Sequence, residues 1–156
     1  MPTDLTARLV DHRFFADLDK KQIARFAACG ELCQVTAGTL LVKEGSPATA
    51  FYALLSGRVA IETRVPSQPP ITLQTVESGD VIGWSWIDAE EWVFDVRTLT
   101  DCELIALDAE QVMKVLTGDS ELGMEIMRRL NRVVSQRLRA TRLQLLDIYG
   151  KGTTGE

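Results

Sequence analysis

The sequence predicts an α+β fold in which an eight-stranded antiparallel β jelly roll, a double-stranded β-helix, lies between an N-terminal helical segment and a long C-terminal dimerisation helix. Apolar residues follow a helical period in 1–30, alternate with a period of two in 31–108, and return to the helical period in 109–149. Short turns rich in Gly and Pro divide the middle region into eight segments. A chain of 156 residues suits one domain with one core, and 150–156 are expected to form a disordered tail.

The N-terminal segment carries the signal of a capped helix. Asp19 is a suitable N-cap, and Gln22 follows it at the position of a capping box. Ile23 and Phe26 then recur at helical spacing, and Gly30 is placed to end the helix.

Turn signals separate eight expected strands in the middle region. They include Gly-Ser-Pro at 45–47, Ser-Gly at 56–57 and Ser-Gly-Asp at 78–80. In RVAIETRV, every second residue is expected on the buried face of the strand. The four residues between them are expected on the solvated face. Trp84 and Trp86 are expected to alternate at the end of a strand. The expected strands are 31–36, 39–43, 50–55, 58–65, 70–76, 80–84, 93–100 and 103–107.

Two further helices are expected after the strands. Asp108 is placed to cap a short helix that ends at Gly118. Asp119 or Ser120 then caps a long helix that runs to about Tyr149.

The long helix has two apolar stripes. Ile126, Leu130 and Val133 are expected to pack on the barrel, while a second stripe follows alternating steps of four and three from Val134 onward. One barrel cannot bury both stripes, so the sequence predicts a parallel homodimer, with Asn131 suited to fix its register. The alternative is a helix folded back on its own domain. The predicted dimerisation residues are Met127, Asn131, Val134, Leu138, Thr141, Leu145 and Ile148.

Composition and charge argue against several classes of protein. The net charge of -5 disfavours a nucleic-acid partner. Five arginines of the long helix are interpreted as a solvated face: Arg128, Arg129, Arg132, Arg139 and Arg142. No apolar run approaches the ~18 residues of a membrane span, and the N-terminus lacks the pattern of a secretory signal. A cytoplasmic location without membrane contact is therefore expected. Only KGTTGE follows Gly150, which predicts no helix-turn-helix domain.

The cysteines and the single histidine indicate no enzyme, metal centre or cofactor. Cys29, Cys33 and Cys102 are odd in number and form no CxxC pair, so a disulfide framework is not predicted. Cys29 and Cys33 with His12 are a possible metal set, but three scattered ligands fall short of a closed tetrahedral site. Small buried side chains are the preferred interpretation. His12 precedes the expected strands, so neither a His-rich metal site nor a His-activated nucleophile can be built in the barrel.

The arrangement resembles the cyclic-nucleotide-binding domain of the catabolite-activator (Crp/Fnr) superfamily. The resemblance rests on AGTLLVKEGSPATAFYALLSGRVAI (37–61), GDVIG (79–83), VRTLTDCELIALD (96–108) and the closing helix. The GWSW…EEWVFD pattern also resembles a short, stand-alone bacterial subgroup that lacks a DNA-binding domain. The resemblance implies a jelly roll with a regulatory role and a ligand pocket beside the GDVIG segment.

The ligand-binding pattern of that family is altered in this chain. In the family, a Glu directly after GDxxG holds the ribose hydroxyl, and an Arg further on pairs with the cyclic phosphate. These positions carry Trp84 and Trp92 here, and no Arg or Lys lies between Gly79 and Val96. Carboxylates at 88, 90 and 91 add negative charge where the anion would sit. A phosphate without its charged partner loses a contact worth roughly 1.5–3 kcal/mol.

The sequence therefore predicts a regulatory sensor or docking module with a degenerate phosphate-binding cassette, which signals through its dimer helix to a protein effector and whose small-molecule ligand is unknown. The alternative is a genuine cAMP- or cGMP-binding regulatory protein that uses backbone amides and Arg97. The tryptophans are interpreted either as core filling or as an aromatic wall for a flat, uncharged or cationic ligand. Thr141 falls where the family touches the purine, and its alternative role is a tolerated seam residue. The predicted ligand-binding residues are Ile82, Gly83, Trp84, Ser85, Trp86, Trp92, Val93, Phe94, Arg97 and Thr141.

Overall fold

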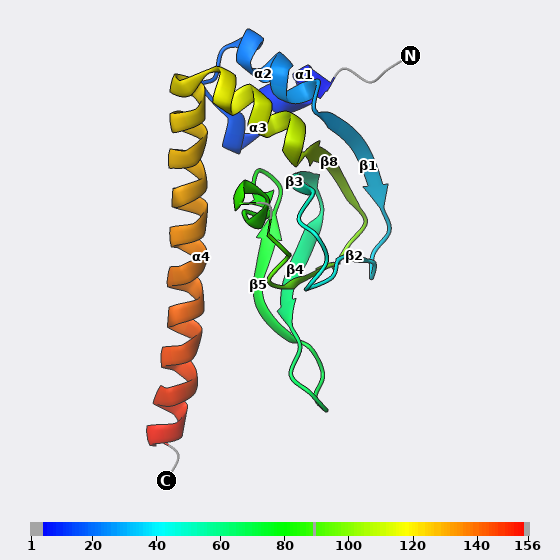
Figure 1. The fold of residues 1–156 in the computed structure, drawn as a ribbon. Helices are drawn as coiled ribbons and strands as arrows, with labels where there is room; N and C mark the ends of the chain where they lie inside the picture. Colours follow the sequence, from blue (N-terminus) through cyan, green and yellow to red (C-terminus); the bar gives the residue numbers. More distant parts are fainter. Residues whose placement is uncertain (1–4, 89, 155–156) are drawn as a thin grey trace.

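The computed structural model describes residues 5–88 and 90–154 and confirms the predicted fold class (Figure 1). The strands in the described residues are β1 (Gly30–Val35), β2 (Leu40–Val42), β3 (Ala50–Ser56), β4 (Arg58–Thr63), β5 (Ile71–Glu77), β6 (Val81–Ile82), β7 (Asp95–Thr98) and β8 (Cys102–Asp108). They form two four-stranded sheets in the orders β1-β8-β3-β6 and β2-β7-β4-β5. All the paired strands run antiparallel, as a jelly roll requires.

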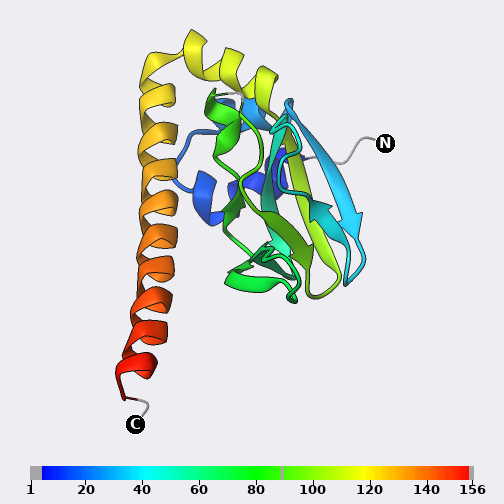
Figure 2. The same cartoon turned by 60° about the horizontal axis from the view of Figure 1, so that its bottom comes forward.

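The helices gather at one end of the sheets and along one side of them (Figure 1). The described helices are α1 (Leu5–Val10), η1 (Arg13–Phe15), α2 (Lys20–Ala27), η2 (Ser85–Asp88), α3 (Ala109–Gly118) and α4 (Ser120–Thr154). The first three pack with α3 at one end, while α4 runs alongside the barrel (Figures 1 and 2). None of the helices in the described part of the chain is both long and apolar enough to span a membrane.

The helix caps predicted from the sequence are confirmed. Asp19 and Gln22 form a reciprocal capping box at the start of α2. Asp108 caps the start of α3, and Asp119 caps the start of α4. Each side chain accepts a hydrogen bond from the backbone N–H three residues later. These caps are local side-chain to backbone contacts, which explains why short sequence patterns identify them.

Gly30 does not end the second helix, contrary to the expectation from the sequence. The α2 helix already ends at Ala27, and Gly30 is the first residue of β1. A Cβ added at Gly30 would lie 2.7 Å from Cγ2 of Ile105, closer than real Cβ contacts come. The glycine is therefore explained by close packing against β8, a contact between residues distant in sequence.

The predicted strands 80–84 and 93–100 are shorter in the structure, because the backbone leaves the sheet at Gly83. This residue has a φ of +106°, outside the region available to strand residues. The following residues form η2 and a loop, so Trp84 and Trp86 do not alternate on a strand end as expected. The chain returns to the sheet only at Asp95.

The last helix continues beyond its expected end. The sequence predicts a disordered tail at 150–156, whereas α4 includes residues up to Thr154. Residues 155 and 156 lie outside the described part of the chain. An isolated glycine such as Gly150 weakens a helix by about 1 kcal/mol without necessarily ending it.

The described chain leaves only part of the predicted seam of α4 uncovered: Leu138, Leu145 and Ile148 are exposed, whereas Met127 packs against the core. Leu122, Ile126 and Leu130 are buried against the barrel, whereas Leu138 on the seam is 69% exposed. The exposed Met124 lies seven residues before Asn131 and extends the same heptad register. Figure 2 shows α4 as one straight helix whose C-terminal end extends past the barrel. The exposed part of the seam is thus not covered by the described domain, and the homodimer stays a prediction.

Candidate ligand pocket beside Gly83

Gly83 and Trp92 are in close contact at the centre of the candidate pocket. A Cβ added at Gly83 would lie 2.5 Å from Cη2 of Trp92 and 2.9 Å from its Cζ3. Position 83 therefore needs a glycine both for its positive φ and for the approach of this indole. Trp92, with 5% of its surface exposed, fills the space directly against the GDVIG segment.

Aromatic side chains continue the packing on both sides of Trp92. Phe94 contacts Trp92 edge-on with ring centroids 5.9 Å apart, and it contacts Trp84 in the same way at 5.2 Å. Trp86 stacks on Phe51 at 4.4 Å, with its Nε1–H donating to the carbonyl of Gly83. Trp86 and Trp92 thus belong to the hydrophobic core, and Trp84 remains half-buried at its edge.

Arg137 of α4 lies over the remaining indole, although it is absent from the residues predicted above. Its guanidinium carbon is 5.6 Å from the centroid of Trp84, within cation–π range. The residue is 8% exposed, and its Nη2 donates to the carbonyl of Val81. Its Nη1 is buried without a hydrogen-bond partner among the described residues. Burial lowers the pKa of Arg137 to about 10, and the charge of Asp80 opposes that effect, so the side chain stays protonated at neutral pH.

A sequence signal for Arg137 exists. Positions 126, 130, 133 and 137 follow one another at steps of four, three and four, so Arg137 continues the stripe that faces the barrel. Arg137 has no role in the predictions from the sequence, and arginine is rarely buried.

Thr141 lies one turn beyond Arg137 and contacts the barrel. Its hydroxyl donates to the carbonyl of Arg137 at 2.9 Å, while the Nε2 of Gln74 on β5 donates to the same carbonyl at 2.7 Å. Gln74 also reaches the Thr141 hydroxyl at 3.3 Å. Thr141, a residue of the predicted seam, is therefore placed between α4 and β5 of its own domain.

Arg97 is not brought to the pocket. It alternates on β7 with the fully buried Val96, so the two side chains point to opposite faces of the sheet. Its Nε donates to Glu62 at 3.2 Å on that outer face. Burial raises the pKa of the neighbouring Asp95, but hydrogen bonds from the Glu44 backbone and Arg64, with the charges of Arg64 and Arg97, hold it below its ordinary value overall.

The other predicted ligand-binding residues divide between core and surface. Ile82, Ser85 and Phe94 are buried, whereas Val93 is exposed. The carboxylates of the loop, at 88, 90 and 91, are also exposed. The structure therefore gathers the predicted aromatic residues but leaves Val93 and Arg97 outside them.

His12 and the cysteines do not assemble into a metal site in the described residues. The Nε2 of His12 lies 3.1 Å from the carbonyl of Leu54, and its Nδ1 accepts from the backbone N–H of Phe14. All three cysteines are free, and burial raises the pKa of Cys29 and Cys33. The preferred interpretation of buried side chains holds for Cys29 and Cys102, while Cys33 is half-buried.

The fold is a jelly roll with a helical arm. The sequence profile of the cyclic nucleotide-binding domain matches residues 32–119, and the chain belongs to this family. Among curated relatives, the CRP-like proteins Clp of Xanthomonas oryzae and Xanthomonas campestris are 27% identical over 139 residues. The match covers 84% of this chain and 60% of the relatives, so the chain spans about 60% of their length.

Solved structures show the same fold. A cyclic nucleotide-binding domain from Methylobacillus flagellatus superposes with a TM-score of 0.76 at 19% identity, covering 91% of this chain and 80% of that one. Clp of Xanthomonas campestris, described as a c-di-GMP responsive global regulator, gives 0.72 at 25% identity, covering 81% and 63%. The regulatory domain of Toxoplasma gondii PKA, solved with cAMP, gives 0.69 at 21% identity, covering 84% and 48%.

Proposed function

We propose that this chain is a non-enzymatic regulatory module that keeps the cyclic-nucleotide-binding fold but has a degenerate phosphate-binding cassette. The observation that carries the proposal is the contact of Trp92 with Gly83. Where the family resemblance implies an arginine for the cyclic phosphate, a buried indole packs against the glycine of the GDVIG segment. An indole does not neutralise an anion, so the charged half of the clamp is missing.

The second position of the clamp has also changed its chemistry. Trp84 stands where the resemblance implies a glutamate, and it stacks against Arg137. The loop adds exposed carboxylates at 88, 90 and 91, which repel an anionic ligand. The loss of one charge-assisted contact, worth roughly 1.5–3 kcal/mol, weakens binding by about one to two decades.

Cyclic-nucleotide binding through Arg97 is the less favoured candidate. Membership of the family supports it in general terms. However, Arg97 faces away from the core and is paired with Glu62. A role in the pocket would require this ion pair to break and β7 to turn over.

The proposed signal path leads from the loop to α4, which we propose forms a parallel homodimer. Trp84 contacts the guanidinium of Arg137, whose Nη2 donates to the carbonyl of Val81. The backbone carbonyl of Arg137 accepts a hydrogen bond from Gln74. A ligand that displaces Trp84 therefore disturbs the attachment of α4 to both sheets. The exposed seam transmits that change to a second copy of the helix and to a protein effector.

The test is calorimetry of the purified protein with cAMP and with cGMP. We expect no saturable binding tighter than about 10 µM, which corresponds to ~7 kcal/mol. Mass spectrometry of small molecules released from the purified protein shows what the pocket carries instead. Saturable micromolar binding of either nucleotide would refute the degenerate cassette.

A further inference from the structure

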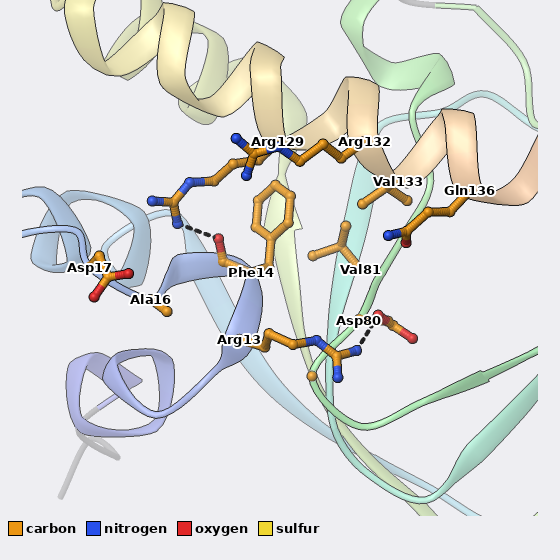
Figure 3. Close-up of a pocket in the computed structure, with 11 residues that line it drawn as sticks. Arg13, Phe14, Ala16, Asp17, Asp80, Val81, Arg129, Arg132, Val133 and Gln136 are labelled. Carbon is orange, nitrogen blue, oxygen red and sulfur yellow. Dashed lines mark hydrogen bonds and ion pairs between the residues drawn. The ribbon is translucent and has the colours of Figure 1, made fainter.

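A second cavity, of about 240 Å³, lies where α4 crosses the N-terminal segment (Figure 3). Three stretches distant in sequence line it: residues 13–17 in and after η1, residues 79–81 at the start of β6, and residues 129–136 of α4. None of the residues predicted for ligand binding is part of its wall. The cavity is therefore separate from the pocket beside Gly83.

The wall of this cavity is rich in guanidinium groups. Figure 3 shows Arg129 and Arg132 approaching from α4 and Arg13 from η1 on the opposite side. Two carboxylates, Asp17 and Asp80, also line it. A local excess of positive charge on a chain with a net charge of -5 marks the cavity as a place that attracts anions.

Two of these arginines are held in place by the surrounding structure. Arg13 donates to Asp80 at 2.5 Å and packs over Gly79, where an added Cβ would lie 3.3 Å from its Cζ. Arg129 donates to the carbonyl of Phe14 at 2.7 Å and to Glu125 at 2.9 Å. Arg129, whose side chain is 14% exposed, is fixed in this way and loses little conformational entropy when a ligand binds.

Neither Arg132 nor the neighbouring Arg137 forms an ion pair with a carboxylate of the described residues. Arg132 is exposed and forms no hydrogen bond or ion pair with the described residues, and its charge acts only at a distance on Glu125. Arg137 lies behind the wall, bonded to the carbonyl of Val81, with its Nη1 unpartnered in the described structure. Three guanidinium groups thus line the cavity, and that of Arg137 is bonded to the backbone of the lining residue Val81.

We propose that this cavity binds a small phosphate-type oxyanion, either inorganic phosphate or the phosphate group of a small phosphomonoester. Guanidinium groups offer paired N–H donors that match phosphate oxygens, and Arg132 and Arg13 are the primary contacts. Gln136, on the same wall, provides an amide as a further donor. The volume of about 240 Å³ leaves room for a phosphate with a small organic body.

The bound oxyanion would join the N-terminal segment to α4. The cavity-lining positions of α4 are 129, 132, 133 and 136, whereas the predicted seam uses 127, 131, 134 and 138. A ligand in the cavity is therefore compatible with the dimer. By linking η1 to the helix, it would stabilise the docked position of the element proposed to carry the signal.

The test is calorimetry with inorganic phosphate in chloride buffers of matched ionic strength. We expect saturable binding by the unaltered protein and a loss of about tenfold or more in Arg132→Gln, the effect of one charge-assisted contact. The matched control is Arg139→Gln, which removes an equally exposed charge from α4 outside the cavity. Its affinity should stay within about twofold, because distant exposed charges are screened.

Other outcomes overturn the proposal. Binding that is absent from the unaltered protein, or that both variants lose equally, shows that no specific site exists. If acetate binds with the same affinity as phosphate, the site is not specific for phosphate-type oxyanions. The affinities for glycerol phosphate and for inorganic phosphate show which of the two phosphate sources the cavity prefers. Since Trp84 and Trp92 do not line the cavity, their substitution should leave phosphate binding unchanged, and the test is independent of the cyclic-nucleotide result.

Discussion

The indole of Trp92 packs against Gly83 so closely that no Cβ fits between them: one added at position 83 would lie 2.5 Å from Cη2 of the indole. This contact joins the end of β6 to the end of the loop that precedes β7. It places an apolar ring where the family resemblance implies a positive charge. The stability of the loop and its ligand preference therefore depend on the same pair of residues.

Gly83→Ala should destabilise the protein by about 2 kcal/mol or more, because it adds both a backbone penalty and a steric clash. Gly38→Ala is the matched control, since Gly38 also has a positive φ, of +80°, but has no atom within 4 Å of an added Cβ. Urea unfolding measures both. The clash should also be relieved when Gly83→Ala is combined with Trp92→Ala. Equal losses in the two glycine variants would contradict the role of Trp92.

The predicted dimer can be tested with a pair of substitutions on the same helix. Light scattering should give about twice the chain mass of 17.3 kDa. Leu138→Asp should dissociate the dimer, because a charge in an apolar seam is left unpaired. Leu143→Asp is the control, since Leu143 is also exposed, at 55%, but lies off the seam. A monomeric starting protein, or equal dissociation by both variants, removes the argument from the seam.

Folding stability should fall as the pH drops below the ordinary pKa of histidine. His12 is the only histidine, and burial lowers its pKa below 6.5, although hydrogen bonding to the Leu54 carbonyl and the charge of Asp80 oppose this. The unfolded chain therefore takes up the proton more readily than the folded one. The contribution of His12 to the free energy of unfolding is fully present above pH 6.5 and is lost as the pH falls toward the folded pKa. The free energy of unfolding changes by at most about 1.4 kcal/mol per pH unit.

Urea unfolding between about pH 7.5 and 5.5 measures this effect, because side-chain carboxylates with ordinary pKa values near 4 titrate below that window. His12→Gln should make the stability nearly independent of pH across the window, even where the variant is less stable overall. A slope that persists unchanged in His12→Gln would assign the effect to another group.

Features that depend on neighbours in sequence could be predicted, and those that depend on tertiary contacts could not. The capping residues Asp19 and Asp108 act on backbone groups three positions away, so their pattern is visible in the sequence. Gly30 was assigned to a helix end because its contact with Ile105 is 75 positions distant and leaves no local signal. The close contact of Gly83 with Trp92, which lies across the loop, leaves no local signal either.

The candidate site shows the same division. Trp84 and Trp92 could be recognised as replacements within a family pattern, but the separation of the tryptophans into core and edge required the structure. Arg137 sits at a barrel-facing position of α4, yet no role was predicted for it from the sequence. A charged residue at an apolar position of a regular stripe is the signal to examine in such helices.

Restoring the charged pair implied by the family should restore the ligand. Trp84→Glu with Trp92→Arg introduces a carboxylate where Trp84 now contacts Arg137, and a cation where the indole packs on Gly83. Position 92 is buried, so the unliganded variant should be less stable than the starting protein, and a bound cyclic phosphate should offset the buried charge. We expect micromolar binding of cAMP or cGMP in calorimetry and a rise in the unfolding temperature with nucleotide. Trp84→Glu alone, which retains the buried indole, should show neither effect. A double variant that folds but binds no nucleotide would mean that the loop backbone, and not only its side chains, has lost the phosphate-binding geometry.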